Sequence, residues 1–219
     1  MAGLNFAADH NVCAYLDPEC CKSSGYRDMI NFLIRSKLHY SLTVCLDVYE
    51  NQIRDFWESA AVSTENGVKM ITSLIAGRPF AVTEDSIRRC LQFGDDQNGV
   101  IEFSGEHVLH VFRRMGYVGE FESDHIEKAK IGLQWKFLIH VFQHCLSKRK
   151  SGWNDIPMAL SSAIIGLVNN ELFNMSGYIF NAMRSNLEYE RSNQFLMYPR
   201  FLQCLIMKLF LIYKVLVLC

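Results

Sequence analysis

The sequence predicts an α+β fold that is mainly α, in which a helical domain holds a small antiparallel β-sheet at about residues 60–82. Apolar residues recur every three or four positions through most of the chain, which is the period of amphipathic helices. Between Val62 and Val82 this period gives way to alternation and to the turn formers Asn66-Gly67 and Gly77. Of the 219 residues, 50% are hydrophobic and 21% are charged, which is typical of a folded protein and excludes global disorder.

The first part of the chain predicts a loosely ordered leader and then two helices. Residues 1–25 are punctuated by Asp17-Pro18 and by Ser23-Ser24-Gly25, which favour turns. Apolar stripes predict helices over residues 26–38 and 46–60. The short segment 41–44 between them has strand character.

Three short strands are expected to form the sheet. Asn66-Gly67 tolerates the positive φ angles of a type I′ hairpin turn, and Val68–Ile75 alternates imperfectly. A third strand, residues 80–82, follows a second turn. Thr83 is then a good N-cap for a helix over residues 84–93, because its hydroxyl can accept a hydrogen bond from the first turn.

From Ser104 onward the sequence predicts only helices. Ser104 caps the first of them, and Asn154 or Asp155 caps the helix that Pro157 enters at its first turn, where proline is tolerated. The expected segments are residues 104–115, 126–150, 158–168, 176–187 and a last apolar run that starts at Pro199.

Charge and cysteine content bear on partners and on compartment. The formal net charge is −1, so no overall positive field draws the protein to nucleic acid or to an anionic membrane. The eight cysteines could form disulfides, but the start of the chain lacks the basic and apolar regions of a secretory signal. We therefore expect an intracellular protein, in the cytoplasm or nucleus, whose thiols are mostly small buried hydrophobes.

Two groups of side chains have some features of a metal centre. His140 and His144 would share a helix face beside Cys145, but the glutamate of a His-Glu-x-x-His motif is absent. A second group near the N-terminus contains no Cys-x-x-Cys pair: His10, Cys13, Cys20 and Cys21. We expect neither group to hold a metal.

No catalytic constellation is present in the sequence. Five acidic residues on the predicted helices form no pair whose environment could be called catalytic: Asp47, Glu50, Glu58, Glu84 and Asp85. The sequence therefore predicts a protein that is not an enzyme and that carries no cofactor.

Basic residues cluster at two predicted helix ends. Arg113 and Arg114 form one pair, and Lys148, Arg149 and Lys150 form a run. Favourable placement at the negative end of a helix dipole explains both clusters, and contact with RNA or DNA is the alternative. The three tryptophans are expected to anchor the core rather than to stack on bases: Trp57, Trp135 and Trp153.

The C-terminal residues 201–219 form an apolar segment interrupted by Gln203, Lys208 and Lys214. The length approaches a membrane span, so a tail-anchored membrane protein is one alternative. Lys208 lies near the middle, where a charge costs about 2.5–3.5 kcal/mol. A buried or dangling apolar helix is the competing expectation.

A set of short motifs marks the lineage of the chain. In order, they are Thr43-Val44, Phe56-Trp57, Asn66-Gly67, Thr83-Glu84, Arg88-Arg89, Met115-Gly-Tyr117, Gln134-Trp-Lys-Phe-Leu-Ile-His140, Cys145-Leu-Ser147, Trp153-Asn154, Ser162-Ala-Ile164, Tyr178-Ile-Phe180 and Phe195-Leu-Met-Tyr-Pro-Arg-Phe201. This set resembles a large family of plant retroelement proteins, similar to the plant transposon protein domain of gag-like reading frames in LTR retrotransposons. The resemblance covers roughly residues 1–204 and is most specific over residues 134–201.

The resemblance implies a division of the chain and a role. Residues 26–204 would form the retroelement-type helical domain, and residues 205–219 would be a non-homologous or truncated tail. Because no active site is evident, the expected role is a gag-like structural or interaction module that acts through protein–protein contacts and self-association. A nucleic-acid-binding module of a transposable element is the alternative.

Members of this family carry labels such as synaptobrevin/longin-like protein and xylulose kinase, and neither has support from the residues. A sugar kinase needs a glycine turn that cradles phosphate, whereas Gly77-Arg-Pro79 and Gly94-Asp-Asp96 are ordinary turns. A synaptobrevin needs a sustained heptad segment, and residues 155–193 keep no such register.

Overall fold

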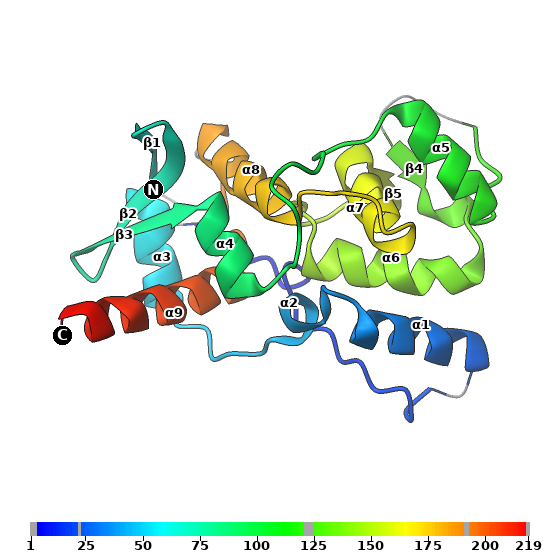
Figure 1. Ribbon diagram of the computed structural model, residues 1–219, viewed down its shortest axis with the longest axis horizontal. Helices are drawn as coiled ribbons and strands as arrows, with labels where there is room; N and C mark the ends of the chain where they lie inside the picture. The colour runs from blue at the N-terminus through cyan, green and yellow to red at the C-terminus, as the bar shows by residue number, and fades with distance from the viewer. Residues whose placement is uncertain (1–3, 22, 121–124, 191–192, 218–219) are drawn as a thin grey trace.

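A computed structural model describes residues 4–21, 23–120, 125–190 and 193–217, and it confirms the predicted fold class, α+β and mainly α (Figure 1). The described helices are α1 Ser24–Arg35, α2 His39–Thr43, α3 Glu50–Ser59, α4 Glu84–Leu91, α5 Gly105–Arg114, α6 Leu133–Cys145, α7 Met158–Val168, α8 Met175–Glu188 and α9 Pro199–Val217, with a 3-10 turn at Lys128–Lys130. The strands are β1 Ala61–Glu65, β2 Val68–Ile75, β3 Arg78–Thr83, β4 His125–Glu127 and β5 Asp155–Pro157.

The predicted sheet is present as β1-β2-β3, with antiparallel neighbours. Ile71 is the centre of its register, since it faces Val62 on β1 and Val82 on β3. Asn66 and Gly67 have φ angles of 50° and 80°, as a type I′ turn requires. The local turn signal therefore set this hairpin.

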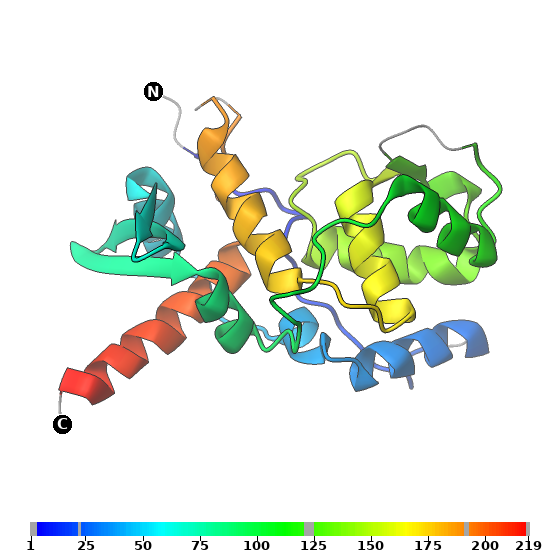
Figure 2. The same ribbon diagram turned by 45° about the horizontal axis from the view of Figure 1, so that its top comes forward.

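Two groups of elements are visible in both views of the ribbon (Figures 1 and 2). Helices α5, α6 and α7 lie with the β4–β5 pair, and α1 runs along α6. The sheet β1–β3 lies with α3, α4 and α9, and α8 packs on α4. The N-terminal segment, residues 4–14, passes between the two groups.

The prediction of a loosely ordered leader is wrong for this N-terminal segment. It has no helix or strand, yet its backbone is bonded to three distant parts of the chain. The N–H of Val12 donates to His144, the N–H of Ala14 donates to Leu42, and the carbonyl of Asn5 accepts from Leu196. The turn-forming residues at 17–25 favoured the prediction of a loose leader. The residues that bond to the N-terminal segment lie far away in sequence and therefore give no local signal. Residues 1–3 and 22 of the predicted leader lie outside the described residues.

The predicted strand at residues 41–44 is instead helix α2. Hydroxyl side chains explain the difference, because Ser41 donates to the carbonyl of Leu38 and Thr43 donates to the carbonyl of His39. These bonds join both hydroxyls to the preceding turn of the helix, and one of them involves Thr43, the β-branched residue of α2.

The prediction of helices alone after Ser104 is also wrong. Helix α6 begins at Leu133 rather than at residue 126, and the chain before it forms β4, which pairs antiparallel with β5. Ile126 and Ile156 face each other in this pair, and both are fully buried. Pro157 ends β5 and is the N-cap of α7, so neither Asn154 nor Asp155 caps that helix. A short buried strand pair carries no periodic signal of its own.

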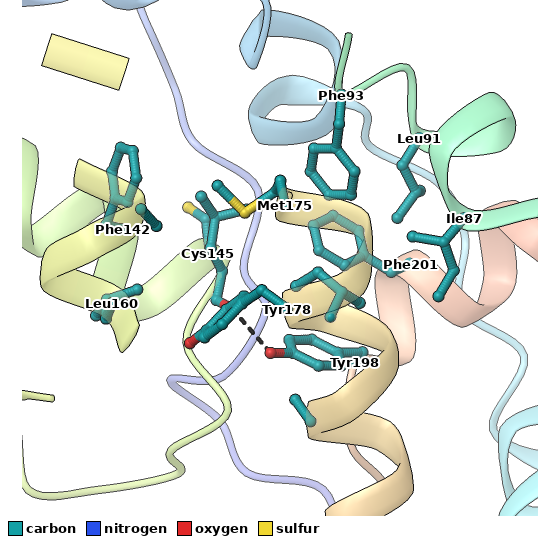
Figure 3. Packing of buried hydrophobic residues seen from close by; sticks show 14 of the residues in the cluster. Ile87, Leu91, Phe93, Phe142, Cys145, Leu160, Met175, Tyr178, Tyr198 and Phe201 are labelled. Atoms are coloured by element: carbon teal, nitrogen blue, oxygen red, sulfur yellow. Dashed lines mark hydrogen bonds between the residues drawn. The ribbon is translucent and has the colours of Figure 1, made fainter. Parts of the chain in front are cut away.

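The core joins the start of α9 to α4, α6 and α8 (Figure 3). Figure 3 shows the rings of Phe93 and Phe201 meeting edge to face, with centroids 6.0 Å apart. The hydroxyl of Tyr198 donates to the carbonyl of Leu146 at 2.8 Å. Trp57 is buried as predicted, and its Nε1–H donates to the carbonyl of Met197. The distinctive block 134–201 thus supplies much of the packing.

Helix α9 runs through the predicted domain end at residue 204 without a break. Leu205 and Ile206 are 1% and 2% exposed, so the first part of the expected tail belongs to the core. Lys208 donates to the carbonyl of Cys90 and lies 4.3 Å from the ring centroid of Tyr40. The last predicted tail residues, 218–219, lie outside the described residues.

Candidate interaction surfaces

The face of the β1–β3 sheet that points away from the core is the first candidate surface. Side chains alternate between two faces along each strand. The inner face packs Phe80 against Phe56 of α3 and Phe210 of α9, with ring centroids 6.1 Å and 5.4 Å apart. The other face, here called the outer sheet face, consists of Ala61, Ser63, Glu65, Val68, Met70, Thr72, Leu74, Pro79, Ala81 and Thr83.

The outer sheet face is nearly free of charge. Glu65 is its only ionisable residue, and Val68 and Leu74 are each 51% exposed. At its edge, β1 is Ala-Val-Ser-Thr-Glu and contains neither a lysine nor a proline. Those are the residues with which many proteins prevent an edge strand from pairing with another chain. This edge is therefore chemically open to pairing.

A groove borders the outer sheet face. Its volume is about 450 Å³, and it lies between Val68, the start of α4 at Thr83 and the side chains of Phe180 and Asn181 on α8. Lys69, Glu84, Asp85 and Arg88 also line the groove, so its walls carry both signs of charge beside the apolar side chains of Val68 and Phe180. A concave surface of mixed polarity next to a flat face suits contact with another polypeptide.

A row of rings and amines on α6 is the second candidate surface. Lys136, His140 and His144 follow one another at intervals of four residues and so share a helix face. The rings of His140 and His144 have centroids 4.2 Å apart and are tilted by 45°, and the rings of His144 and Trp153 have centroids 4.4 Å apart and are tilted by 35°. These four residues together with Lys128 are here called the α6 stripe.

The α6 stripe has a positive field. Burial and the nearby Lys136 lower the pKa of the Lys128 amine. Burial, His144 and Lys128 likewise lower the pKa of the His140 ring. Lys128 donates to the side chain of Gln143 at 2.7 Å, so its amine is held in place beside the rings. Stacked rings beside fixed cations are the components of many single-strand nucleic-acid sites.

The structure separates the two basic clusters that the sequence offered as nucleic-acid contacts. Arg113 and Arg114 end α5, and the chain just beyond them bonds to the start of α6 through Val118 N–H and the carbonyl of Lys130. Lys148, Arg149 and Lys150 follow the opposite end of α6. The 13 residues of α6 span about 20 Å. A nucleic acid that contacted both clusters would therefore have to extend along the whole length of α6.

The run of residues 148–150 is close to the α6 stripe. Arg149 donates from Nη1 to the carbonyl of Gly152, next to Trp153, and Lys148 and Lys150 are exposed. Lys150 also lies over the ring of Phe195, 5.2 Å from its centroid. Trp153 itself is half-buried and stacked on His144, so the prediction that it anchors the core is wrong. The spacing of His140 and His144, four residues apart and followed by Trp153, was the sequence signal that could have predicted this group of rings.

The two groups with metal-like features are used in other ways. Cys145 is buried, whereas His144 donates from Nδ1 to the carbonyl of Asp9 and lies against the ring of His140. Both ring nitrogens of His10 are engaged by main-chain groups. Across the described part of the chain, no three His, Cys, Asp or Glu residues converge as metal ligands do.

Comparisons with protein-family models, curated proteins and solved structures found no match to this chain. The resemblance to plant retroelement proteins therefore stays a prediction from the sequence. Among the described residues, no helix combines the length and the apolar composition needed to cross a membrane.

Proposed function

We propose that this chain is a non-enzymatic, gag-like interaction module that associates with further copies of itself through the outer sheet face. The observation that carries the proposal is the near absence of charge on that face, with only Glu65 among its ten residues. Monomeric proteins rarely expose a large contiguous apolar patch, and the apolar residues exposed on this face are Ala61, Val68, Leu74, Pro79 and Ala81.

The sequence of the edge strand β1 indicates that the partner is a second copy of this chain. If two β1 strands pair antiparallel about Ser63, Val62 faces Thr64 of the other copy and Glu65 faces Ala61. The two Glu65 carboxylates then lie about 13 Å apart along the strands, so no like charges oppose each other. Strand β1 is therefore self-complementary, and pairing would join the two sheets across a two-fold axis.

Analytical ultracentrifugation of the full chain over a wide concentration range tests this proposal. We expect reversible association that Val68→Lys and Leu74→Lys each weaken at least tenfold, because each lysine would place a charge without a partner on the uncharged face that is continuous with the β1 edge. Val118→Lys is the matched control, since Val118 is 84% exposed and lies beyond α5, far from the sheet. A monomer at every concentration, or equal effects of all three variants, would contradict the proposal.

The α6 stripe favours a second candidate function, binding of single-stranded nucleic acid. The closely spaced rings of His140, His144 and Trp153 lie on the same stripe as Lys128 and Lys136. Bases stack on such rings, and the amines attract phosphates in a salt-dependent manner.

Fluorescence anisotropy with a labelled RNA at several salt concentrations tests this second function. Trp153→Ala and the pair Lys148→Gln/Lys150→Gln should each weaken binding several-fold. The pair Arg113→Gln/Arg114→Gln is the charge-matched control at the other end of α6 and should have little effect. Binding that is absent, or that responds equally to both pairs, would exclude the α6 stripe as the site.

A further inference from the structure

Two cysteines from distant parts of the chain meet in one cleft. The cleft has a volume of about 510 Å³ and lies between the N-terminal segment, the loop from α2 to α3 and the first turn of α9. Cys13, Cys45 and Arg200 line it, together with apolar side chains such as Val12 and Leu46. Cys45 is exposed and Cys13 is half-buried, so reagents in solution can reach the pair.

The backbone holds the two thiols together. Ala14 N–H donates to the carbonyl of Leu42 at 2.8 Å, and the Cys13 thiol donates to the carbonyl of Thr43 at 3.1 Å. These bonds fix Cys13 beside the stretch of chain that leads to Cys45. Burial and the neighbouring Cys45 thiol raise the pKa of Cys13. The bonds of Cys13 and Ala14 thus place two free thiols in one cleft without a covalent link.

Arg200 gives this pair a positive neighbour. Its guanidinium is 4% exposed and donates to the carbonyls of Asn11, Ser41 and Val44, while Nη2 has no partner. Burial lowers the pKa of Arg200, and the neighbouring groups that oppose this shift are thiols, with Cys13 and Cys45 among them. The charge of Arg200 opposes the upward shift of the Cys13 pKa. A thiolate formed in this cleft is therefore stabilised by a buried cation.

We propose that Cys13 and Cys45 are a redox site that forms a reversible intramolecular disulfide. The oxidant is a low-molecular-weight disulfide such as oxidised glutathione. The exposed Cys45 thiolate attacks one sulfur of that disulfide, which forms a mixed disulfide and releases one small thiolate. The Cys13 thiolate then attacks Sγ of Cys45, forms the Cys13–Cys45 bond and releases the second thiolate. The protein loses two electrons and two protons, and the oxidant gains both as two small thiols.

The disulfide would join the N-terminal segment covalently to the loop before α3. In the reduced protein, hydrogen bonds and the packing of side chains such as Leu4 and His10 hold that segment between the two groups of elements, with no covalent cross-link. Oxidation would therefore slow the release of residues 4–14, and reduction would restore it. The cleft contains no residue of the outer sheet face or of the α6 stripe, although the N-terminal segment bonds to His144 of the stripe through Asp9 and Val12.

Equilibration of the full chain in glutathione buffers of graded redox potential tests the proposal. After acid quenching and alkylation, peptide mass spectrometry should find a Cys13–Cys45 link whose yield rises with the oxidised fraction and falls on addition of reductant. Cys13→Ser and Cys45→Ser should each abolish it. Cys20→Ser is the matched control, because Cys20 is an exposed cysteine in the same N-terminal region, and it should leave the yield unchanged.

A bifunctional bimane reagent gives a second measurement on the reduced wild-type protein. It fluoresces when it bridges two neighbouring thiols, so the signal should be lost in Cys45→Ser and kept in Cys20→Ser. Absence of the Cys13–Cys45 link at every potential would overturn the proposal. So would a link from Cys13 to Cys20 or Cys21 in equal yield, since contact in the cleft would then not direct the reaction.

Discussion

The ring of His10 accepts a hydrogen bond at Nε2 from the main-chain N–H of Tyr198, at 2.8 Å. Its Nδ1 lies 3.1 Å from the carbonyl of Arg149 and therefore carries the proton of a neutral ring. One side chain of the N-terminal segment thus joins the turn after α6 to the start of α9. Burial lowers the pKa of His10 from 6.5 to about 4, because a charged ring would lose its water and its bond from Tyr198.

Stability should therefore fall as the pH drops from about 6.5 to about 4. In this range the unfolded chain binds a proton at residue 10 and the folded chain does not, so acid favours unfolding. The full shift corresponds to about 3 kcal/mol, which is present above pH 6.5 and lost below pH 4. Denaturant unfolding at graded pH should show a shallower pH slope for His10→Gln than for wild type. His39→Gln, at an exposed histidine, should keep the wild-type slope. Parallel slopes for all three proteins would show that His10 does not carry this effect.

Asn11→Ala should destabilise the protein by about 2–4 kcal/mol. The Asn11 side chain donates to the carbonyl of Cys145 and accepts from the N–H of Phe201, and all three residues are buried. Alanine would leave one donor and one acceptor without partners, and the melting temperature should fall by roughly 4–16 °C. Asn5→Ala is the control, since Asn5 is exposed and contributes its carbonyl, which alanine retains. Calorimetry that finds the two variants equal would mean that water replaces both bonds.

Truncation after residue 204 should unfold much of the protein, whereas truncation after residue 210 should not. The shorter chain lacks Leu205 and Ile206, which are buried, and each such loss costs about 2–5 kcal/mol. It also lacks Lys208, which bonds to the carbonyl of Cys90. Far-UV circular dichroism and thermal melts compare the two products directly. Equal melting temperatures would mean that the domain ends at residue 204 after all.

Thr83→Ala should destabilise the protein by about 1 kcal/mol. The Thr83 hydroxyl accepts from the N–H of Ser86, and the Ser86 hydroxyl accepts from the N–H of Thr83, which completes a capping box at the start of α4. Thr83→Ser keeps the hydroxyl and should restore most of the stability. If serine is as damaging as alanine in urea titrations, packing of the threonine methyl group rather than capping explains the loss.

Local signals were enough wherever the partners are close in sequence. Asn66-Gly67 forms the expected hairpin turn, and Thr83 and Ser104 cap the helices that they were predicted to cap. In each case the favourable interaction spans three residues or fewer. The fold class follows from these signals, since they separate the β1–β3 sheet from the helices around it.

The candidate surfaces could be predicted only in part. The sequence shows directly that β1 has few charges. Which face of the sheet is covered depends on the positions of α3 and α9, which the sequence does not show. The spacing of His140 and His144 on one helix face is readable too. The stacking of Trp153 on His144 depends on the turn that brings the chain back after α6.

By itself the sequence determined the mainly α composition, the β1–β3 hairpins and the caps of α4 and α5, because propensity and turn chemistry act over a few residues. Only the tertiary structure decided the order of the N-terminal segment, the β4–β5 pair and the meeting of Cys13 with Cys45. His10 reaches Tyr198 across 188 positions of the chain, and no pattern within either segment encodes the other. Buried polar groups need partners, and folding in three dimensions selects which distant residues supply them.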